Sequence, residues 1–367
     1  MTARHSRATA AVRPPSDIAA GCDRLIDAGL EVSAAGTPER PMIVVDLDPL
    51  CDAAPGTVAR AAASARQCLP LLVGVLRRPP TGYLGPILAA TTLTLTDRAV
   101  SDLLHQVVPV EDVDEALETL HAAVTRSPGA AMACGQLLRQ TVHLDTTRAL
   151  AAEAAVYSML LGGPEFDRWL SERGPVRLRA VPDRDLVQVL RSGNQLSITL
   201  NDPDRRNALS ARLREELLAA LDVARADPTV TSVWIHGAGP VFCSGGDLDE
   251  FGRAVDPVAA YLVRLDRAPW RVMDQVADRL TVHVHGGCIG AGLEMAAFAQ
   301  HIVAEADTWF QLPEVRMGLV PGAGGTVSVP RRIGRWRAAW LMLTGERLSA
   351  QRALRWGLVD RLADRER

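Results

Sequence analysis

The sequence contains no lysine, and all 40 of its basic residues are arginines. Schiff-base chemistry, pyridoxal-phosphate catalysis and a Walker-type phosphate loop each depend on a lysine amine, so these classes of function are excluded. Because 43 acidic residues balance the arginines and leave a net charge of −3, the composition also argues against a nucleic-acid partner.

Cysteine is sparse as well, with six residues that form no CxxC pair. Neither a disulfide framework nor a zinc site is therefore indicated, and a cytoplasmic protein is expected. His283 and His285 share one face of a probable strand, but no third ligand is close in sequence, so no metal site is predicted. Apolar runs stay well short of the roughly 18 residues that a membrane-spanning helix needs, so no membrane partner is expected.

Changes in texture along the 367 residues suggest two domains behind a short tail. Residues 1–15 lack a long apolar run and are expected to be a disordered tail. Residues 16–182 combine short buried strands with a helical stretch and end in a linker at residues 176–183. Residues 183–367 begin with a hairpin and continue as alternating strands and helices, which predicts the α/β class. This alternation fits a doubly wound sheet and a spiral of βα turns equally well.

Two helices are predicted in detail within the second segment. Val113, Leu117, Leu120 and Val124 recur with the spacing of one helix face. Asp145 is predicted to cap the start of a helix that runs to residue 161, where a Gly-Gly-Pro sequence ends it.

Two glycine-rich loops, residues 239–248 and 285–294, each follow a predicted strand. Glycine backbone lets a ligand come close to bare N–H groups, and the second loop also opens a helix, whose dipole adds partial positive charge. Two such N–H groups aimed at one point would stabilise an oxyanion by about 3–4 kcal/mol per donor. The alternatives are tight turns without a ligand and, for the second loop, part of a dinucleotide-binding pattern.

Two glutamates accompany these loops. Glu294 lies one helical turn beyond Ala291, and Glu314 follows a strand among apolar residues. Burial of a carboxylate is costly, so two buried glutamates are expected to have a function. Beside an oxyanion hole they could hold one water and exchange protons with the α- and β-carbons of a carbonyl compound. A surface ion pair of Glu314 with Arg316 or Arg331 is the alternative.

Five motifs in a fixed order resemble the crotonase (enoyl-CoA hydratase/isomerase) superfamily across about residues 186–362. These motifs are residues 201–209, 242–248, 286–294, 312–326 and 356–360. The resemblance implies a spiral of ββα turns in the C-terminal half, a homotrimer or hexamer, and an acyl-CoA thioester as ligand. It implies no cofactor besides the coenzyme A carried by the substrate.

The resemblance also assigns roles to residues. It places the oxyanion hole on the backbone N–H groups of Gly246 and Ala291, the latter at a position where the family usually has glycine. Glu294 would activate the water, and Glu314 would handle the α-carbon proton. The implied substrate-binding positions are Ala208, Gly245, Asp247, Leu248 and Asp249.

The function implied by the resemblance is an enoyl-CoA hydratase/isomerase-type lyase that adds water to a 2-enoyl-CoA in the syn sense. A Δ3,Δ2-isomerase, another crotonase reaction such as hydrolysis or dehalogenation, and a non-catalytic acyl-CoA-binding or assembly subunit are the alternatives. Phe251, Tyr261 and Trp270 either shape the acyl pocket or form a helical cover, and Cys243 and Cys288 are expected to be packing residues.

The first half departs from the family pattern. Members of the family carry C-terminal helices beyond the Gly-Leu-Val-Asp motif, whereas here seven residues follow Asp360. Segments 103–109, 113–124 and 166–173 resemble those helices. We therefore expect residues 16–182 to form a smaller α/β unit ending in helices, a degenerate crotonase unit that serves as a scaffold for the C-terminal core.

Overall fold

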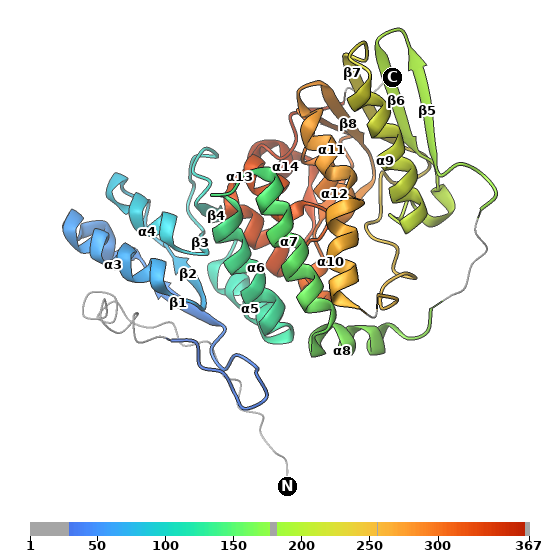
Figure 1. Ribbon diagram of the computed structural model, residues 1–367. Coiled ribbons are helices and arrows are strands. Elements are labelled where there is room, and N and C mark those ends of the chain that lie inside the picture. The colour runs from blue at the N-terminus through green and yellow to red at the C-terminus, as the bar shows by residue number, and fades with distance from the viewer. Residues whose placement is uncertain (1–28, 177–181, 255, 364–367) are drawn as a thin grey trace. The chain divides into compact units, whose positions relative to one another are not determined.

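The computed structural model describes residues 29–176, 182–254 and 256–363 (Figure 1). The chain divides into two compact units between Pro128 and Gly129. The tail expected at residues 1–15 and most of the linker expected at residues 176–183 lie outside the described residues.

The first unit is a parallel α/β structure. Its sheet has the order β1-β2-β3-β4, and each neighbouring pair is parallel. Every residue of β2 and β3 is buried, as expected for a parallel sheet with both faces covered. The bounds are β1 (Met42–Asp46), α3 (Pro55–Gln67), β2 (Leu71–Val75), α4 (Gly85–Ala90), β3 (Leu93–Thr96), β4 (Val107–Pro109) and α5 (Val113–Arg126).

The predicted stripe of α5 is confirmed, because Val113, Leu117, Leu120 and Val124 are all buried. Its N-cap is Asp112, whose side chain accepts the N–H groups of residues 114 and 115.

The second unit begins with three helices, α6 (Pro128–Thr141), α7 (Thr146–Leu161) and α8 (Pro164–Arg173). The predicted cap of α7 is confirmed, since the Asp145 side chain accepts the Arg148 N–H. The sequence pattern predicts the domain boundary at residues 182–183. In the structure, the division between the two compact units falls 54 residues earlier along the chain, at residues 128–129. The reason is packing, because α7 contacts α10, α11 and α13 of the second unit (Figure 1).

The remainder of the second unit winds between two sheets. A six-stranded sheet has the order β13-β10-β8-β7-β6-β5, and a three-stranded sheet has the order β12-β11-β9. The segments β8-β9-α12 and β10-β11-α13 are two successive ββα turns, which confirms the predicted spiral. The bounds are β5 (Val187–Ser192), β6 (Gln195–Leu200), α9 (Ala211–Ala226), β7 (Ser232–Gly237), α10 (Pro257–Asp266), α11 (Pro269–Gln275), β8 (Leu280–Val284), β9 (Gly287–Ile289), α12 (Ala291–Ala296), β10 (His301–Ala304), β11 (Trp309–Gln311), α13 (Gly325–Thr344), β12 (Leu348–Ser349), α14 (Ala350–Trp356) and β13 (Arg361–Leu362).

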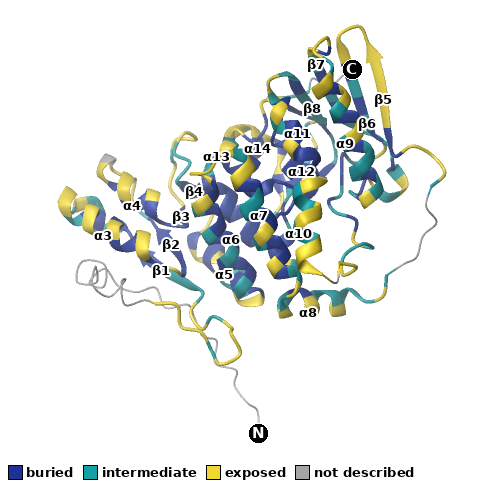
Figure 2. Ribbon diagram, viewed as in Figure 1, coloured by how far each residue is buried: buried dark blue, intermediate teal, exposed yellow. Residues whose placement is uncertain are grey.

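Burial follows this architecture. Every residue of α12 is buried, and α7 buries one face while its other face is exposed (Figure 2). Within the described part of the chain, no helix combines the length and the apolar character required to cross a membrane.

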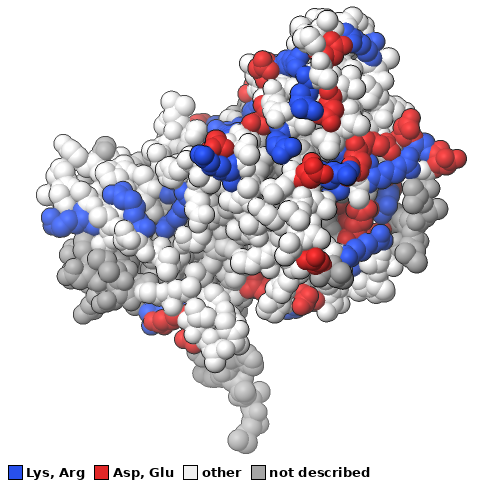
Figure 3. All heavy atoms as spheres, viewed as in Figure 1, with Lys and Arg blue, Asp and Glu red and all other residues white. Residues whose placement is uncertain are grey.

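On the face shown in Figure 3, arginine and acidic side chains of the second unit are intermingled. Arg267, for example, pairs with both Glu215 and Asp266. Exposed ion pairs of this kind contribute little to stability, about 0–1 kcal/mol each.

A buried asparagine fixes the approach to the first glycine loop. Asn207 is fully buried with φ at 53°, in the left-handed region that asparagine tolerates better than most residues. Its side-chain N–H₂ donates to the carbonyl oxygens of Ala238, Val241 and Phe242, and its Oδ1 accepts the Asp202 N–H. One side chain therefore holds the loop after β7 against the turn after β6.

Replacing Asn207 with alanine should lower the free energy of unfolding by about 3 kcal/mol or more, because several buried backbone groups lose their partner. Denaturant unfolding measures this change. Asn194→Ala is the matched control, since the exposed Asn194 side chain donates to the Thr231 hydroxyl and to no other group among the described residues. Equal losses in both variants would contradict the anchoring role of Asn207.

Candidate active site

The two glycine loops lie side by side. The Ile289 N–H donates to the Cys243 carbonyl, and the Cys243 N–H donates to the Gly287 carbonyl. The approach is close enough that a Cβ on Gly292 would lie 2.7 Å from the Cys243 Cβ. A glycine is required there, and the contact brings the start of α12 next to the first loop.

Gly246 and Ala291 both line one cavity of about 470 Å³. Neither the Gly246 N–H nor the Ala291 N–H donates to another backbone group among the described residues. Ala291 is the first residue of α12, where a helix N–H has no partner within the helix. Its φ is not positive, so the methyl group that replaces the usual glycine is accommodated without strain.

Both predicted glutamates line the same cavity and are buried. The Glu294 Oε2 accepts the N–H groups of Ala323 and Gly325 at 2.7 and 2.9 Å. Glu314 begins a 3₁₀ helix after β11, and its Oε2 has no hydrogen-bond partner among the described residues.

The surface ion pair considered for Glu314 is not formed with either arginine. Arg331 pairs with Asp274 instead, and Arg316 donates to the Thr344 carbonyl. Among the described residues the Glu314 carboxyl, which lines the cavity, forms no ion pair with an arginine.

Burial raises the pKa of both glutamates. The pKa of Glu314 rises to about 8, chiefly through desolvation and further through the charge of Glu153. Desolvation raises the pKa of Glu294 well above its ordinary value, and the charges of Glu314 and Glu153 act in the same direction. The two backbone N–H groups on Glu294 act against this rise because they stabilise its ionised form.

The other predicted positions are only partly brought to the cavity. Asp247 lines it, whereas Ala208, Gly245, Leu248 and Asp249 are not among the lining residues. The Asp247 and Asp249 carboxylates both bind Arg205, at 2.9 and 3.0 Å.

Of the three aromatic residues considered for the acyl pocket, Phe251 and Trp270 line the cavity and Tyr261 does not. Cys243 and Cys288 are fully buried, and burial raises the pKa of the Cys243 thiol to about 12, so both are packing residues. Within the described ranges, no group of three or more histidine, cysteine or acidic side chains is arranged to hold a metal ion.

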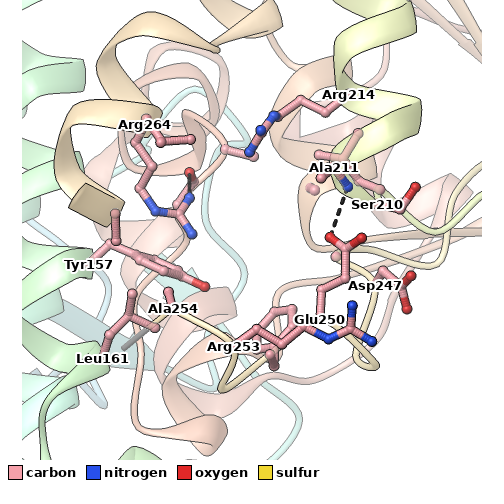
Figure 4. Close-up of a pocket in the computed structure, with 18 of the residues that line it drawn as sticks. Tyr157, Leu161, Ser210, Ala211, Arg214, Asp247, Glu250, Arg253, Ala254 and Arg264 are labelled. Carbon is pink, nitrogen blue, oxygen red and sulfur yellow. Dashed lines mark hydrogen bonds between the residues drawn. The ribbon is translucent and has the colours of Figure 1, made fainter. Parts of the chain in front are cut away.

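Helix α7 supplies site residues that the sequence analysis misses. Tyr157 lines the cavity, and its ring lies under the Arg264 guanidinium at 3.5 Å (Figure 4). Arg264 also donates to the Gly322 carbonyl, and a Cβ on Gly322 would lie 2.2 Å from the Tyr157 ring. On the other side of the cavity, Glu250 accepts the Ala211 N–H at 2.8 Å (Figure 4).

Glu153, one helical turn before Tyr157, is 2% exposed. The sequence feature that could have identified it is a single acidic residue between alanines in a predicted helix, and the structure places this residue on the buried face of α7.

Comparison with known proteins shows which protein family this chain is related to. The family model for enoyl-CoA hydratase/isomerase matches residues 191–367. The chain is 36% identical over 172 residues to the 2,3-dehydroadipyl-CoA hydratase of Escherichia coli, covering 47% of this chain and 67% of that protein. It is 35% identical over 175 residues to the trans-2-decenoyl-[acyl-carrier-protein] isomerase of Streptococcus mutans, covering 47% and 66%.

A solved enoyl-CoA hydratase from Thermoplasma volcanium is 32% identical, with 50% of this chain and 73% of that chain covered and a TM-score of 0.45. The chain spans about two thirds of the length of the curated relatives it matches. From the sequence relationship and the ordered motifs, the chain belongs to the enoyl-CoA hydratase/isomerase family.

Proposed function

We propose that this protein is an enoyl-CoA hydratase, which adds water across the 2,3 double bond of an acyl-CoA thioester. The observation that carries the proposal is the arrangement of groups on one cavity. The backbone N–H groups of Gly246 and Ala291, which have no backbone partner in the part of the chain that the structure describes, share it with two buried glutamates whose pKa values are raised.

In this mechanism the thioester oxygen binds between the Gly246 and Ala291 N–H groups. Negative charge that develops on this oxygen as the enolate forms is stabilised by the two donors, typically by about 3–4 kcal/mol for each. The cost of reorganising these donors during the reaction is small because both are held by the contact between the loops.

The glutamates divide the proton transfers. In the reactive form of the pair Glu294 is ionised, a form that its two backbone donors stabilise, and it removes one proton from the water whose oxygen bonds to Cβ. Protonated Glu314, whose Oε2 has no partner within the described ranges, transfers its proton to Cα. The pair holds one proton before and after the addition, and the product is the 3-hydroxyacyl thioester.

A Δ3,Δ2-isomerase is the second candidate. The unpartnered oxygen of Glu314 could move one proton between two carbons of the acyl chain without water, and one relative is described as an isomerase. Incubation with 2-enoyl and 3-enoyl thioesters distinguishes the two, because only the hydratase yields a 3-hydroxy product from the 2-enoyl substrate. Binding without any conversion would instead favour the non-catalytic subunit.

The family resemblance also supports a homotrimer or hexamer, which sedimentation analysis tests.

Glu294→Gln and Glu314→Gln should each lower kcat for hydration by about 10²- to 10⁴-fold, because each removes one proton-transfer group. Affinity for a saturated acyl-CoA should change only a few-fold. Decay of the enoyl-thioester absorbance measures the rate, and Glu305→Gln, at an exposed position, is the control. Full activity in either active-site variant would contradict the proposed roles.

The rate should also depend on pH in a defined direction. Since burial raises the pKa of Glu314 to about 8 and the mechanism needs this carboxyl protonated, kcat/KM should fall as the pH rises through about 8. Hydration and dehydration should decline in parallel, because both directions use the pair with one proton. A rate that stays level from about pH 7 to about pH 9 would show that Glu314 is not the acid.

A further inference from the structure

Glu153 of α7 is a buried carboxylate that the proposed reaction does not use. It does not line the cavity and is 2% exposed. Its Oε1 accepts the Gly324 N–H at 2.7 Å, and its Oε2 accepts the Thr326 N–H at 2.9 Å and the Thr326 hydroxyl at 2.7 Å. Both carboxylate oxygens are therefore bound to the segment that leads into α13.

The same short segment also holds Glu294. The N–H groups of residues 323 and 325 donate to Glu294, whereas those of residues 324 and 326 donate to Glu153. Alternate N–H groups along four consecutive residues thus bind two carboxylates from different helices. If the segment moved away from Glu153, the N–H groups that donate to Glu294 would move with it. Glu153 therefore holds the backbone that positions Glu294.

Glu153 also acts on the glutamate pair through its charge. Its negative charge contributes to the raised pKa of both Glu294 and Glu314. Burial raises the pKa of Glu153 itself to about 7, while its Thr326 and Gly324 hydrogen bonds and the charge of Arg264 lower it. The ionisable groups that interact with it are Glu294 of α12, Glu314 after β11, Arg264 of α10 and Cys134 of α6. Helix α13 supplies the two Thr326 groups that donate to Glu153. The charged residue Asp274 of α11 forms an ion pair with Arg331 of α13.

We propose that Glu153 is a positioning residue of this site, which holds Glu294 in place through residues 323–326. The part of this role that concerns turnover rests on the proposed hydratase function. Glu153 lies outside residues 191–367, the segment matched by the family model, so the site includes a residue from the preceding helices.

Glu153→Gln tests the role in the full chain. The variant keeps the side-chain size but removes the charge and one acceptor. We expect kcat to fall by about 10- to 100-fold, as for a small misplacement of a catalytic group, while KM changes less than about threefold. The decline of kcat/KM at high pH should move to lower pH, because the pKa of Glu314 falls once the neighbouring charge is gone.

Glu216→Gln is the matched control. Glu216 also accepts two backbone N–H groups, those of Leu186 and Val187, and it does not line the cavity. It should change stability without moving the pH profile.

A second pair of measurements does not depend on turnover. In protein labelled with ¹³C at the glutamate carboxyl carbon, the Glu314 signal is identified by its loss in Glu314→Gln, and its pKa is then read from an NMR titration. This pKa should be lower in Glu153→Gln than in the wild type and unchanged in Glu216→Gln. Hydrogen exchange of the peptide containing residues 323–326 should be faster in Glu153→Gln.

Faster exchange with an unchanged Glu314 pKa would overturn the proposal, because Glu153 would then be structural only. An unchanged exchange rate would also overturn it. A lowered Glu314 pKa in a protein that hydrates no enoyl-CoA would support the positioning role and refute the proposed function.

Should Glu153→Gln fail to fold, Thr326→Val removes only the hydroxyl donor to Glu153. It should speed exchange of the same peptide and lower the Glu314 pKa, because the pKa of Glu153 rises when this donor is lost and less negative charge then acts on Glu314; an unchanged exchange rate and pKa would overturn the proposal.

Discussion

The site depends on how backbone N–H groups replace water around buried carboxylates. A glutamate removed from water loses several hydrogen bonds, and its ionised form is then strongly disfavoured. In this protein the segment 323–326 restores part of that solvation, with alternate N–H groups directed to Glu294 and Glu153. In the described part of the chain, the Glu314 Oε2 accepts no hydrogen bond. In the proposed reaction the two backbone donors on Glu294 stabilise its ionised form, which is the form that acts as the base.

The same constraint explains why helices that precede the spiral belong to the second unit. A loop with its N–H groups pointing to both sides needs acceptors on both sides, and α12 provides only one set. Helix α7 provides the other through Glu153, and one turn later Tyr157 closes part of the cavity against Arg264. The compact unit therefore starts at α6 rather than at the hairpin β5–β6.

Much of the fold could be predicted because it is encoded locally. The spacing of Val113, Leu117, Leu120 and Val124 indicates a helix face, and Asp145 indicates a helix start, without reference to any distant residue. The ordered motifs of the C-terminal half likewise predict the ββα turns and place Glu294 and Glu314 on one cavity.

The remainder is determined by contacts between distant parts of the chain. Glu153 and Thr326 are 173 residues apart, and no periodicity in either segment indicates that they meet. For the same reason, sequence texture could not show that the helices of residues 129–173 pack with the second unit. Asp247 lines the cavity, whereas Ala208 and Leu248 do not. This difference depends on the path of the loop backbone, which cannot be deduced from the positions of the motifs in the sequence.

The contact between Gly322 and Tyr157 has an evolutionary consequence. The aromatic ring occupies the volume that a methyl group at position 322 would need. A larger residue at position 322 would be tolerated only together with a smaller residue at position 157. The two positions should therefore change together during evolution. Chains of this arrangement should therefore show correlated substitutions between a helix ahead of the five ordered motifs and a loop within the fourth of them.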